Sequence, residues 1–514
     1  MLNIFKISKL LLLFTTLAVL MGCNQRYTVT FDSNGGTAID SVIVNKGDLV
    51  SEPTYPTKEG YTFEGWYKED NLWDFENKVY SDLTLISKWS LNTYTITIDT
   101  DGGMPIEPLS FKYGEEISIE TPKKVGFEFV GWDEDVPSTM PACNLSLKAI
   151  WKEAFISIGS IGPISGETSI YGLAVKKGIE LAIEEINNNG GILVGETYKK
   201  FKLDFINDEA SSDKAATALS TLVDKKADII VGAVTSGCTE GLIREAVKVG
   251  IPVITPTGTA DKLTVGEDGN QRSKRTNIFR ACFYDSYQGE YMAKYAKEAG
   301  YEKAYVLFNN DDDYSVGLKD AFVETAEANG MTVVAQGYAK DVKDFKSFWA
   351  PVLSGEYQCV YVPDYYETVY NVLKTGYAEG YTGVCYGGDG WDGVIQQVKE
   401  GDDASFLENC FYTNHYFGAS ENEVVKKFVA AYKAKYNGEA PVSFAALGYD
   451  AVYMAKQAIE QAGSTDYAKV VEALTNGTFD GLVTSSKGFK FNNGNPEKEA
   501  VVITFKDGKE VEAK

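Results

Sequence analysis

Residues 228–255 read DIIVGAVTSGCTEGLIREAVKVGIPVIT, and this stretch decides the fold class of most of the chain. A strand-like run at 228–232, apolar from Ile229 onward, is followed by an amphipathic segment at 238–249 and by a second apolar run at 252–255. Short β-branched runs on either side of a helical pattern are typical of a β-α-β unit, whose strands lie parallel in one sheet. The stretch therefore predicts an α/β fold with helices covering a parallel sheet.

The same alternation extends on both sides of this unit, from about residue 154 to residue 514. Further strands are expected at 155–161, 201–207, 304–308, 332–336, 359–362, 384–387 and 500–505. Helices are expected at 171–187, 212–225, 286–299, 315–329, 365–379, 391–399, 421–436, 444–462 and 466–475. Because about 360 residues exceed what one such sheet accommodates, we expect two lobes, each with a parallel sheet covered by helices on both faces.

An internal repeat precedes the α/β part. YTVTF at 27–31 returns as YTITI at 94–98, DSNGG at 32–36 as DTDGG at 99–103, and GYTFEGW at 60–66 as GFEFVGW at 126–132. Each copy ends on a strand with a tryptophan, Trp89 or Trp151. Alternating β-branched and aromatic residues with Gly-containing turns predict short strands joined by hairpins around a small aromatic core. We expect two small β-rich modules, at 27–90 and 93–152.

The N-terminus has the pattern of an export signal. Lys6 and Lys9 precede an uncharged apolar run at 10–21, which is too short for a membrane span. The run ends in Leu20-Met21-Gly22-Cys23, which resembles a bacterial lipoprotein lipobox. The resemblance implies a signal peptide at 1–22, a lipidated linker at 23–26 and a protein anchored by lipid to the outside of the cell membrane, as on a Gram-positive-type surface. The alternative is an ordinary signal peptide with a chance cysteine.

The composition excludes several classes of function. The net charge is 49 − 73 = −24, which disfavours nucleic-acid binding because that requires clustered Lys and Arg. His415 is the only histidine, and the sequence has no HExxH, CxxC, P-loop or dinucleotide-binding motif. We therefore expect no metal, no cofactor and no enzymatic activity. The six cysteines after Cys23 are scattered, so we expect buried free thiols, with one disulfide left possible.

A series of motifs in the α/β part resembles the type I periplasmic binding proteins, and within them the Leu/Ile/Val-binding protein-like receptors of ABC importers. The motifs are GPISG at 162–166 with Tyr171-Gly172, INNNGG at 186–191, VGAVTSGCT at 231–239, IPVITP at 251–256, Phe279-Arg280 and GGDGW at 387–391. The resemblance implies two doubly wound parallel-sheet lobes with a ligand cleft between them. Lobe I would use about 154–282 and 415–490, and lobe II about 283–414 and 491–514. It also implies a monomer that presents a bound amino acid to a membrane permease.

The two upstream modules are similar to the Listeria–Bacteroides repeat, also called the internalin B-type repeat, which is a β-grasp-like surface module. This resemblance implies either contact with a partner or a stalk that holds the next domain away from the membrane. We favour the stalk, because two copies make only a short binding array.

Polar residues at strand ends form the first half of a candidate ligand site. In doubly wound sheets ligands bind beyond the carboxyl ends of the strands. There Ser236 opens a helix, and Thr257 and Thr259 follow the next strand. Hydroxyls and helix N-termini suit a carboxylate, so we expect Ser236, Thr259 and the backbone amide of Thr257 to bind one. The alternative is that these residues only cap a helix and form turns.

Asp389 forms the second half, in the glycine-rich strand end GGDGWDG. A carboxylate there can pair with an ammonium group. The family resemblance implies that Asp389 holds an α-ammonium with Tyr365 as a second contact, although Asp389 is shorter than the glutamate of some members. The alternatives are a turn aspartate and an aromatic at a helix start. The side-chain pocket is expected to draw on Tyr171, Val234, Tyr314, Trp391 and Phe444.

These patterns together predict a lipid-anchored substrate-binding protein of an ABC importer that closes two lobes around an amino acid. The side chain of that amino acid is expected to be branched-chain, or otherwise apolar or aromatic. Two other interpretations remain open. One is a surface adhesion or interaction protein whose α/β part has lost ligand binding, and the other is a receptor of the same fold for an amide or a nucleoside.

Overall fold

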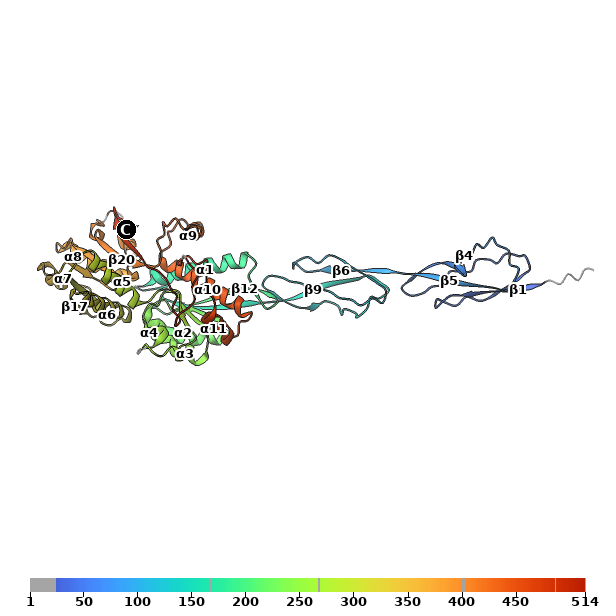
Figure 1. The fold of residues 1–514 in the computed structure, drawn as a ribbon, viewed down its shortest axis with the longest axis horizontal. Helices are drawn as coiled ribbons and strands as arrows, with labels where there is room; N and C mark the ends of the chain where they lie inside the picture. Colours follow the sequence, from blue (N-terminus) through green and yellow to red (C-terminus); the bar gives the residue numbers. More distant parts are fainter. Residues whose placement is uncertain are drawn as a thin grey trace, which may run out of the picture. The chain divides into compact units, whose positions relative to one another are not determined.

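The computed structural model describes residues 25–166, 168–266, 269–399, 401, 403–485 and 487–513. The chain divides into two compact units, one built of β-strands and a larger one of the α/β type (Figure 1). The predicted signal peptide and the predicted lipidation site, Cys23, lie outside the described residues. Within the described ranges, none of the helices combines the length and the apolar character that a membrane crossing requires.

Each sequence repeat forms one small sheet. The first has the order β2-β1-β5-β3-β4, with β1 (Arg26–Asp32), β2 (Val42–Asn45), β3 (Tyr61–Lys68), β4 (Asn71–Leu72) and β5 (Leu83–Leu91). The second has the order β7-β6-β9-β8, with β6 (Thr93–Asp99), β7 (Leu109–Lys112), β8 (Phe127–Trp132) and β9 (Leu145–Glu153). In both sheets the first long strand pairs in parallel with the last one, β1 with β5 and β6 with β9.

The tryptophans that end the two repeats make the same contact. Nε1 of Trp89 donates to the carbonyl oxygen of Ser33 at 3.1 Å, and Nε1 of Trp151 donates to that of Thr100 at 3.0 Å. Both acceptors lie in the glycine-containing turn after the first strand. Trp66, at 1% exposure, lies in the core of the first repeat. The repeated aromatic residues therefore organise two small β cores of the same design.

The first sheet of the α/β unit defines lobe I and has the order β11-β12-β10-β13-β14-β15. Its strands are β10 (Phe155–Gly162), β11 (Ile192–Val194), β12 (Thr197–Asn207), β13 (Ile229–Gly232), β14 (Val253–Thr255) and β15 (Ile278–Arg280). Its helices are α1 (Ser169–Asn188), α2 (Ser212–Asp224), α3 (Ser236–Val249), α4 (Lys262–Val265), α9 (Glu423–Lys435), α10 (Ser443–Ala462) and α11 (Tyr467–Asn476). All strand pairs are parallel except β11 with β12.

Helices cover both faces of this sheet. Along β13, Ile229 and Val231 pack into the core cluster that contains the buried residues of α1 and α10, while Ile230 packs into the cluster of α2 and α3. Apolar residues at consecutive positions of a strand are expected when both faces are buried. The uninterrupted apolar run at 229–232 is therefore explained by a central strand whose two faces are both buried.

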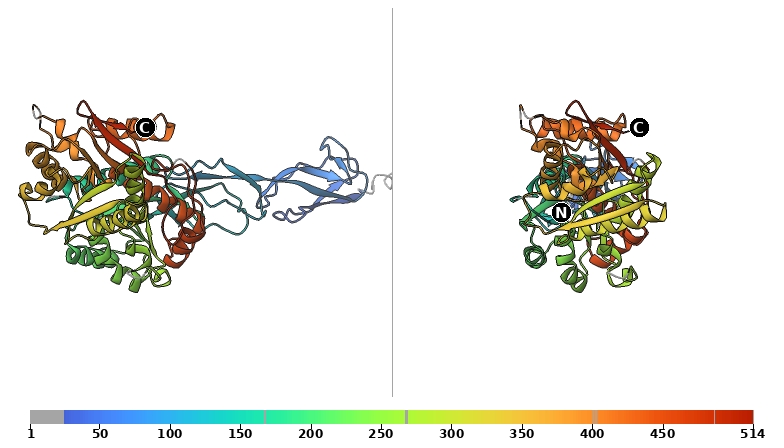
Figure 2. Two further views of the ribbon diagram at one scale, coloured as in Figure 1. Left: turned by 60° about the vertical axis from the view of Figure 1, so that its left-hand side comes forward. Right: turned by 90° about the vertical axis from the view of Figure 1, so that its left-hand side faces the viewer.

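The second sheet defines lobe II and has the order β17-β16-β18-β19-β20-β21-β22. Its strands are β16 (Lys303–Asn309), β17 (Thr332–Tyr338), β18 (Cys359–Tyr361), β19 (Val384–Gly387), β20 (Cys410–Asn414), β21 (Val501–Lys506) and β22 (Lys509–Glu512). Its helices are α5 (Asp285–Glu298), α6 (Asp313–Ala328), α7 (Lys346–Leu353) and α8 (Tyr366–Ala378). The sheet is parallel up to β20, and β21 and β22 extend it as an antiparallel hairpin, drawn in red in Figure 2.

The structure corrects two expectations about lobe II. The predicted helix at 391–399 is replaced by two short 3-10 turns, η2 (Asp389–Trp391) and η3 (Val394–Gln397). Gly393 between them has a φ of 97°, which an α-helix does not accommodate. The final strand was expected in a parallel sheet but pairs antiparallel with β20.

The chain passes between the lobes at 281–284, at 415–422 and at 477–500. The six cysteines from Cys143 onward are free thiols, and all but Cys143 are buried. Among the described residues no disulfide is formed, and Cys385 and Cys410 face each other across the β19–β20 pair.

Candidate functional site

Lobe I contributes three hydroxyl residues at the carboxyl ends of β13 and β14. α3 begins at Ser236, whose Oγ accepts the backbone N–H of Ala260 at 3.2 Å. A hydroxyl that accepts this bond keeps its own proton for a further acceptor. The hydroxyl of Thr257 donates to the carbonyl oxygen of Val234 at 2.5 Å, so the donor that Thr257 can offer a ligand is its backbone N–H. Thr259 is 1% exposed and lines the same cavity.

A buried arginine holds the loop that carries Thr259. The guanidinium of Arg280, at 0% exposure, donates to the carbonyl oxygens of Gly258, Thr259 and Ala260 at 3.1, 2.6 and 2.9 Å. Three charge-assisted bonds to consecutive carbonyls fix the backbone of this loop. The structure thus gives Arg280 the role of holding one wall of the site.

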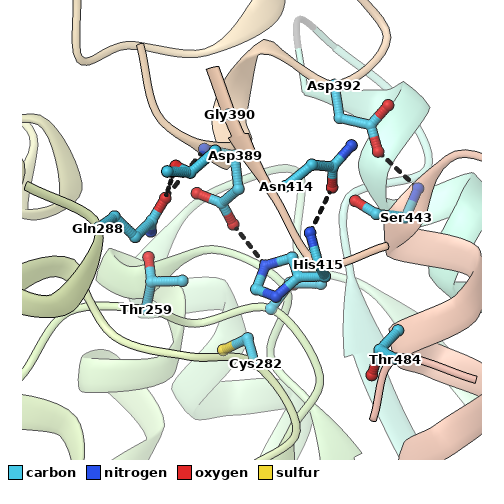
Figure 3. A network of polar contacts seen from close by, with 12 residues as sticks. Thr259, Cys282, Gln288, Asp389, Gly390, Asp392, Asn414, His415, Ser443 and Thr484 are labelled. Atoms are coloured by element: carbon cyan, nitrogen blue, oxygen red, sulfur yellow. Dashed lines mark hydrogen bonds and ion pairs between the residues drawn. The ribbon is translucent and has the colours of Figure 1, made fainter. Parts of the chain in front are cut away.

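Lobe II contributes Asp389, which follows β19 and is 2% exposed. Its Oδ1 accepts the hydroxyl of Tyr314 at 2.9 Å, and its Oδ2 lies 2.9 Å from Nε2 of His415. Its backbone N–H donates to Oε1 of Gln288 at 3.0 Å (Figure 3). The carboxylate is therefore held from both oxygens and through its backbone.

Tyr171, in the first turn of α1, links the two lobes. Its hydroxyl donates to the carbonyl oxygen of Gly390 and accepts the backbone N–H of Tyr366 at 3.0 Å, both in lobe II. Its ring stacks on Phe444, at the start of α10, with centroids 4.2 Å apart. Burial raises the pKa of Tyr171 well above its ordinary value, so the hydroxyl keeps its proton at neutral pH.

Close packing of α1 and α10 brings these two rings together. A Cβ on Gly178 of α1 would lie 1.9 Å from the carbonyl oxygen of Ala445 on α10, so only glycine allows this crossing. The first turn of α10 therefore lies against the third turn of α1, and Phe444 in that first turn stacks on Tyr171.

One small cavity collects the residues from both lobes. It is lined by Tyr171, Val234, Thr235, Ser236, Thr257, Thr259, Tyr314, Tyr365, Asp389, Gly390 and Phe444. Its volume is about 10 Å³, roughly the space of one water molecule. An amino acid can therefore enter only when the lobes separate or the aromatic rings rotate.

The structure brings together every predicted site residue except Trp391. The indole Nε1 of Trp391 donates to the carbonyl oxygen of Val362 at 2.8 Å, and the residue is 0% exposed. Its ring packs against Gly387, where a Cβ would lie 2.1 Å from it. The 3-10 turn after Asp389 thus directs Trp391 into the core of lobe II, which corrects its expected place in the pocket wall.

A larger, polar pocket lies outside this cavity and shares Thr235 and Tyr365 with it. It has a volume of about 360 Å³ and is lined from both lobes, with five acidic residues and one basic residue: Glu209, Asp311, Asp312, Asp364, Glu367 and Lys340. Burial raises the pKa of Asp364 to about 7. At another place between the lobes, Nζ of Lys262 lies 3.0 Å from Oδ1 of Asp313 and forms an ion pair.

Sequence reasoning missed two residues that contact Asp389. His415 follows β20, a strand that was not expected, and Gln288 lies in the first turn of α5. The only available signal for His415 was that it is the single histidine of the chain. In the described part of the chain no three His, Cys, Asp or Glu side chains are grouped to hold a metal ion.

Comparison with known protein families identifies both parts of the chain. Residues 156–510 match the family described as periplasmic binding protein. Residues 27–88 and 94–142 match the Listeria-Bacteroides repeat domain. Among individual proteins, the Leu/Ile/Val-binding protein homolog 3 of Brucella melitensis is 31% identical over 326 residues, which cover 63% of this chain and 84% of that protein.

Two solved structures are similar to the α/β unit. A leucine binding protein, LivK, from Thermotoga maritima has a TM-score of 0.63 and 29% identity, covering 70% of this chain and 98% of that chain. The branched-chain amino acid transporter substrate binding protein LivJ from Streptococcus pneumoniae, in complex with isoleucine, has a TM-score of 0.62 and 28% identity. This match covers 70% of this chain and 100% of that one.

Proposed function

The chain belongs to the periplasmic binding protein family, and on this premise we propose that it is the lipid-anchored substrate-binding component of an ABC importer for an apolar α-amino acid. Its α/β unit has the type I periplasmic binding protein fold, preceded by a β-rich repeat region. The family consists of binding proteins and not of enzymes. The chain is therefore a solute-binding protein of the ABC transporter type.

The observation that carries the amino-acid assignment is the pairing of groups across the cavity. Hydroxyls of Ser236 and Thr259 lie on lobe I, and the carboxylate of Asp389 lies on lobe II, on the wall of the same cavity. A ligand with a carboxylate and an ammonium on one carbon fits donors on one side and an acceptor on the other. Only closure brings both sides within reach, so the ligand itself would stabilise the closed state.

The other residues that line the cavity support an apolar side chain on the ligand. Val234, Phe444 and the rings of Tyr171 and Tyr365 line the cavity beside the polar groups. The similar proteins support the same side chain: one is named a Leu/Ile/Val-binding protein homolog, one a leucine binding protein, and one was solved in complex with isoleucine. Release of the bound amino acid to a membrane permease is the step that the family implies for this chain.

Isothermal titration calorimetry of the mature chain against the twenty amino acids tests this function directly. We expect measurable binding of one or more aliphatic amino acids and none of their carboxamides, which keep the ammonium group and lack the carboxylate. Native mass spectrometry of the purified protein, before any ligand is added, would identify a co-purified amino acid by its mass. Binding of leucinamide as tightly as of leucine would contradict the assignment and favour the amide receptor, and binding of nucleosides alone would favour the nucleoside receptor.

Anchoring by lipid is a separate part of the proposal and rests on the lipobox at 20–23. Two acyl chains would hold the protein at the membrane, since each buried CH₂ contributes about 0.8 kcal/mol. We expect Cys23→Ala to release the protein from the membrane fraction or to leave it unprocessed. Metabolic labelling with a palmitate analogue should mark the wild type only, and equal labelling of the variant would contradict the anchor.

We propose that the two repeats act as a spacer. Each repeat has its own buried core, around Val29 and Leu85 in the first and around Ile96 and Leu147 in the second. A chain that begins at Glu153 should therefore bind its ligand as tightly as the full mature chain. Loss of affinity in a folded truncated chain would show that the repeats belong to the binding unit. Attachment of isolated repeats to a cell surface would favour the adhesion alternative.

A further inference from the structure

The only histidine of the chain lies directly behind the carboxylate of the ligand site. His415 is 3% exposed, and its Nε2 lies 2.9 Å from Oδ2 of Asp389 (Figure 3). Its ring stacks on Phe283, with centroids 3.7 Å apart and an interplanar angle of 24°. Phe283 lies in the 281–284 connection and His415 begins the 415–422 connection, so the pair lies where the chain passes between the lobes.

The hydrogen bonds around the ring indicate which nitrogen carries the proton. Burial lowers the pKa of His415, although Asp389 opposes this effect, so the imidazole is neutral at pH 7. An ionised carboxylate can only accept, so a bond to Asp389 requires the proton on Nε2. Nδ1 has no hydrogen-bond partner among the described residues, which fits an unprotonated nitrogen.

The Nε2–H group of His415 is important for the ligand site because the side chain of Asp389 is buried and cannot rely on water for hydrogen bonds. A buried carboxylate is stable in its ionised form only when hydrogen-bond donors replace the lost water. Tyr314 supplies one donor to Oδ1 and His415 supplies one to Oδ2. Each oxygen keeps a second lone pair, which remains for a cationic group in the cleft. The two donors therefore fix the direction in which the carboxylate can receive a ligand.

We propose that His415 is a positioning residue that holds the Asp389 carboxylate aimed into the cleft, and that it thereby sets the preference for ligands with an α-ammonium group. This inference rests on the proposed amino-acid function and extends it to a residue that does not line the cavity. A purely structural role would predict a different result, because loss of packing alone weakens the binding of all ligands together.

Two variants and two ligands distinguish a positioning role of His415 from a purely structural one. L-leucine and 4-methylpentanoate share a carbon skeleton and a carboxylate, and only leucine carries the ammonium. His415→Leu removes the donor and keeps an apolar side chain of moderate size, whereas His415→Gln keeps an N–H near the position of Nε2. A hydrogen bond to a charged group typically changes affinity by about 10- to 150-fold.

We expect His415→Leu to lose about 10-fold or more in affinity for L-leucine and less than threefold for 4-methylpentanoate. His415→Gln should restore the preference to within about threefold of the wild type. Calorimetry gives the affinities, and circular dichroism with thermal melting checks folding. An equal loss for both probes, or an unchanged preference in a folded His415→Leu protein, would overturn the proposal.

Nuclear magnetic resonance tests the contact without any ligand. Because the chain has one histidine, a ¹⁵N-labelled sample gives one imidazole signal set. At pH 7 we expect the Nε2–H tautomer in the wild type and changed imidazole shifts in Asp389→Asn. A proton on Nδ1, or shifts that do not respond to Asp389→Asn, would refute the role of His415 even if leucine fails to bind. If neither L-leucine nor 4-methylpentanoate binds the wild type, while the imidazole spectrum is the expected one, the amino-acid function is refuted and the contact between His415 and Asp389 is not.

Discussion

Replacing Asp389 by asparagine tests the ligand site most directly. Asparagine has nearly the same shape as aspartate and keeps one oxygen for the Tyr314 hydroxyl, which lies 2.9 Å from Oδ1 in the wild type. Its amide group can face His415, because the imidazole can move its proton from one nitrogen to the other. The substitution therefore removes the charge and leaves the packing, so the fold is expected to remain intact.

The expected loss of affinity follows from burial. Asp389 is 2% exposed, so water does not weaken its interaction with a ligand cation. Loss of one partner of a buried, hydrogen-bonded charge pair costs about 2–5 kcal/mol. This corresponds to a loss of roughly 30-fold to several-thousandfold in affinity, measured by calorimetry with the best ligand of the amino-acid panel.

Asp392 provides a matched control three residues further along. It is 3% exposed, and its Oδ2 accepts the backbone N–H of Ser443 at 2.5 Å, but it does not line the cavity. Asp392→Asn should retain binding within about threefold. Binding within threefold of the wild type by Asp389→Asn, or equal losses in both variants, would refute the reasoning that Asp389 pairs with a ligand ammonium.

The other predictions concern hydroxyl groups and one titrating carboxyl. Ser236→Ala should weaken binding by about 0.5–1.5 kcal/mol in calorimetry, the usual value of one hydrogen bond, and no change would remove Ser236 from the site. Tyr171→Phe deletes the bond to Gly390 and should shift the liganded protein toward an open form, seen as a larger radius of gyration in X-ray scattering; an unchanged radius would contradict it. Burial raises the pKa of Asp364 from 3.8 to about 7, so the folded chain holds a proton that the unfolded chain releases. The protonated Asp364 carboxyl therefore adds to the free energy of unfolding below pH 4, and this contribution is lost as the pH rises through 7. Asp364→Asn should therefore melt a few degrees higher than the wild type at pH 8 and not at pH 4, and equal melting shifts at both pH values would contradict the raised pKa.

Long helices of the α/β unit, and the strands that alternate with them, are predictable from sequence. The pattern at 444–462 predicts α10, which spans Ser443–Ala462, because twenty residues give an unambiguous periodicity. β14 has three residues and was predicted, because it follows the helix α3 in the alternating pattern. β15 and β20 were missed because no long helix directly precedes them: a four-residue helix and a 3-10 turn lie before β15, and 3-10 turns lie before β20. The antiparallel end of the sheet had an overlooked signal. Asp507-Gly508 both have positive φ, as in the tight turns that join antiparallel strands.

The walls of the site were predictable because ligands of such sheets bind at the carboxyl ends of strands. That rule gives positions along the chain and not the direction of each side chain. Trp391 fails for this reason, since a 3-10 turn directs its ring into the core. His415 was missed for a related reason, because recognising it required β20 and therefore a strand at the same sheet edge.

The way the chain divides between the lobes also constrains how the protein can fold. Lobe I receives α10 and α11 only after the chain has passed through lobe II, and lobe II receives β21 and β22 from residues 501–512. Contacts between segments so far apart require closure of long loops, which slows folding. A chain that is still leaving a ribosome or a secretion channel has all strands of the lobe I sheet by residue 280, but it lacks α10 and α11 of lobe I and the last two strands of the lobe II sheet. Lobe I can therefore be completed only after α11 at residue 476 has emerged, and lobe II only after residues 501–512 have emerged.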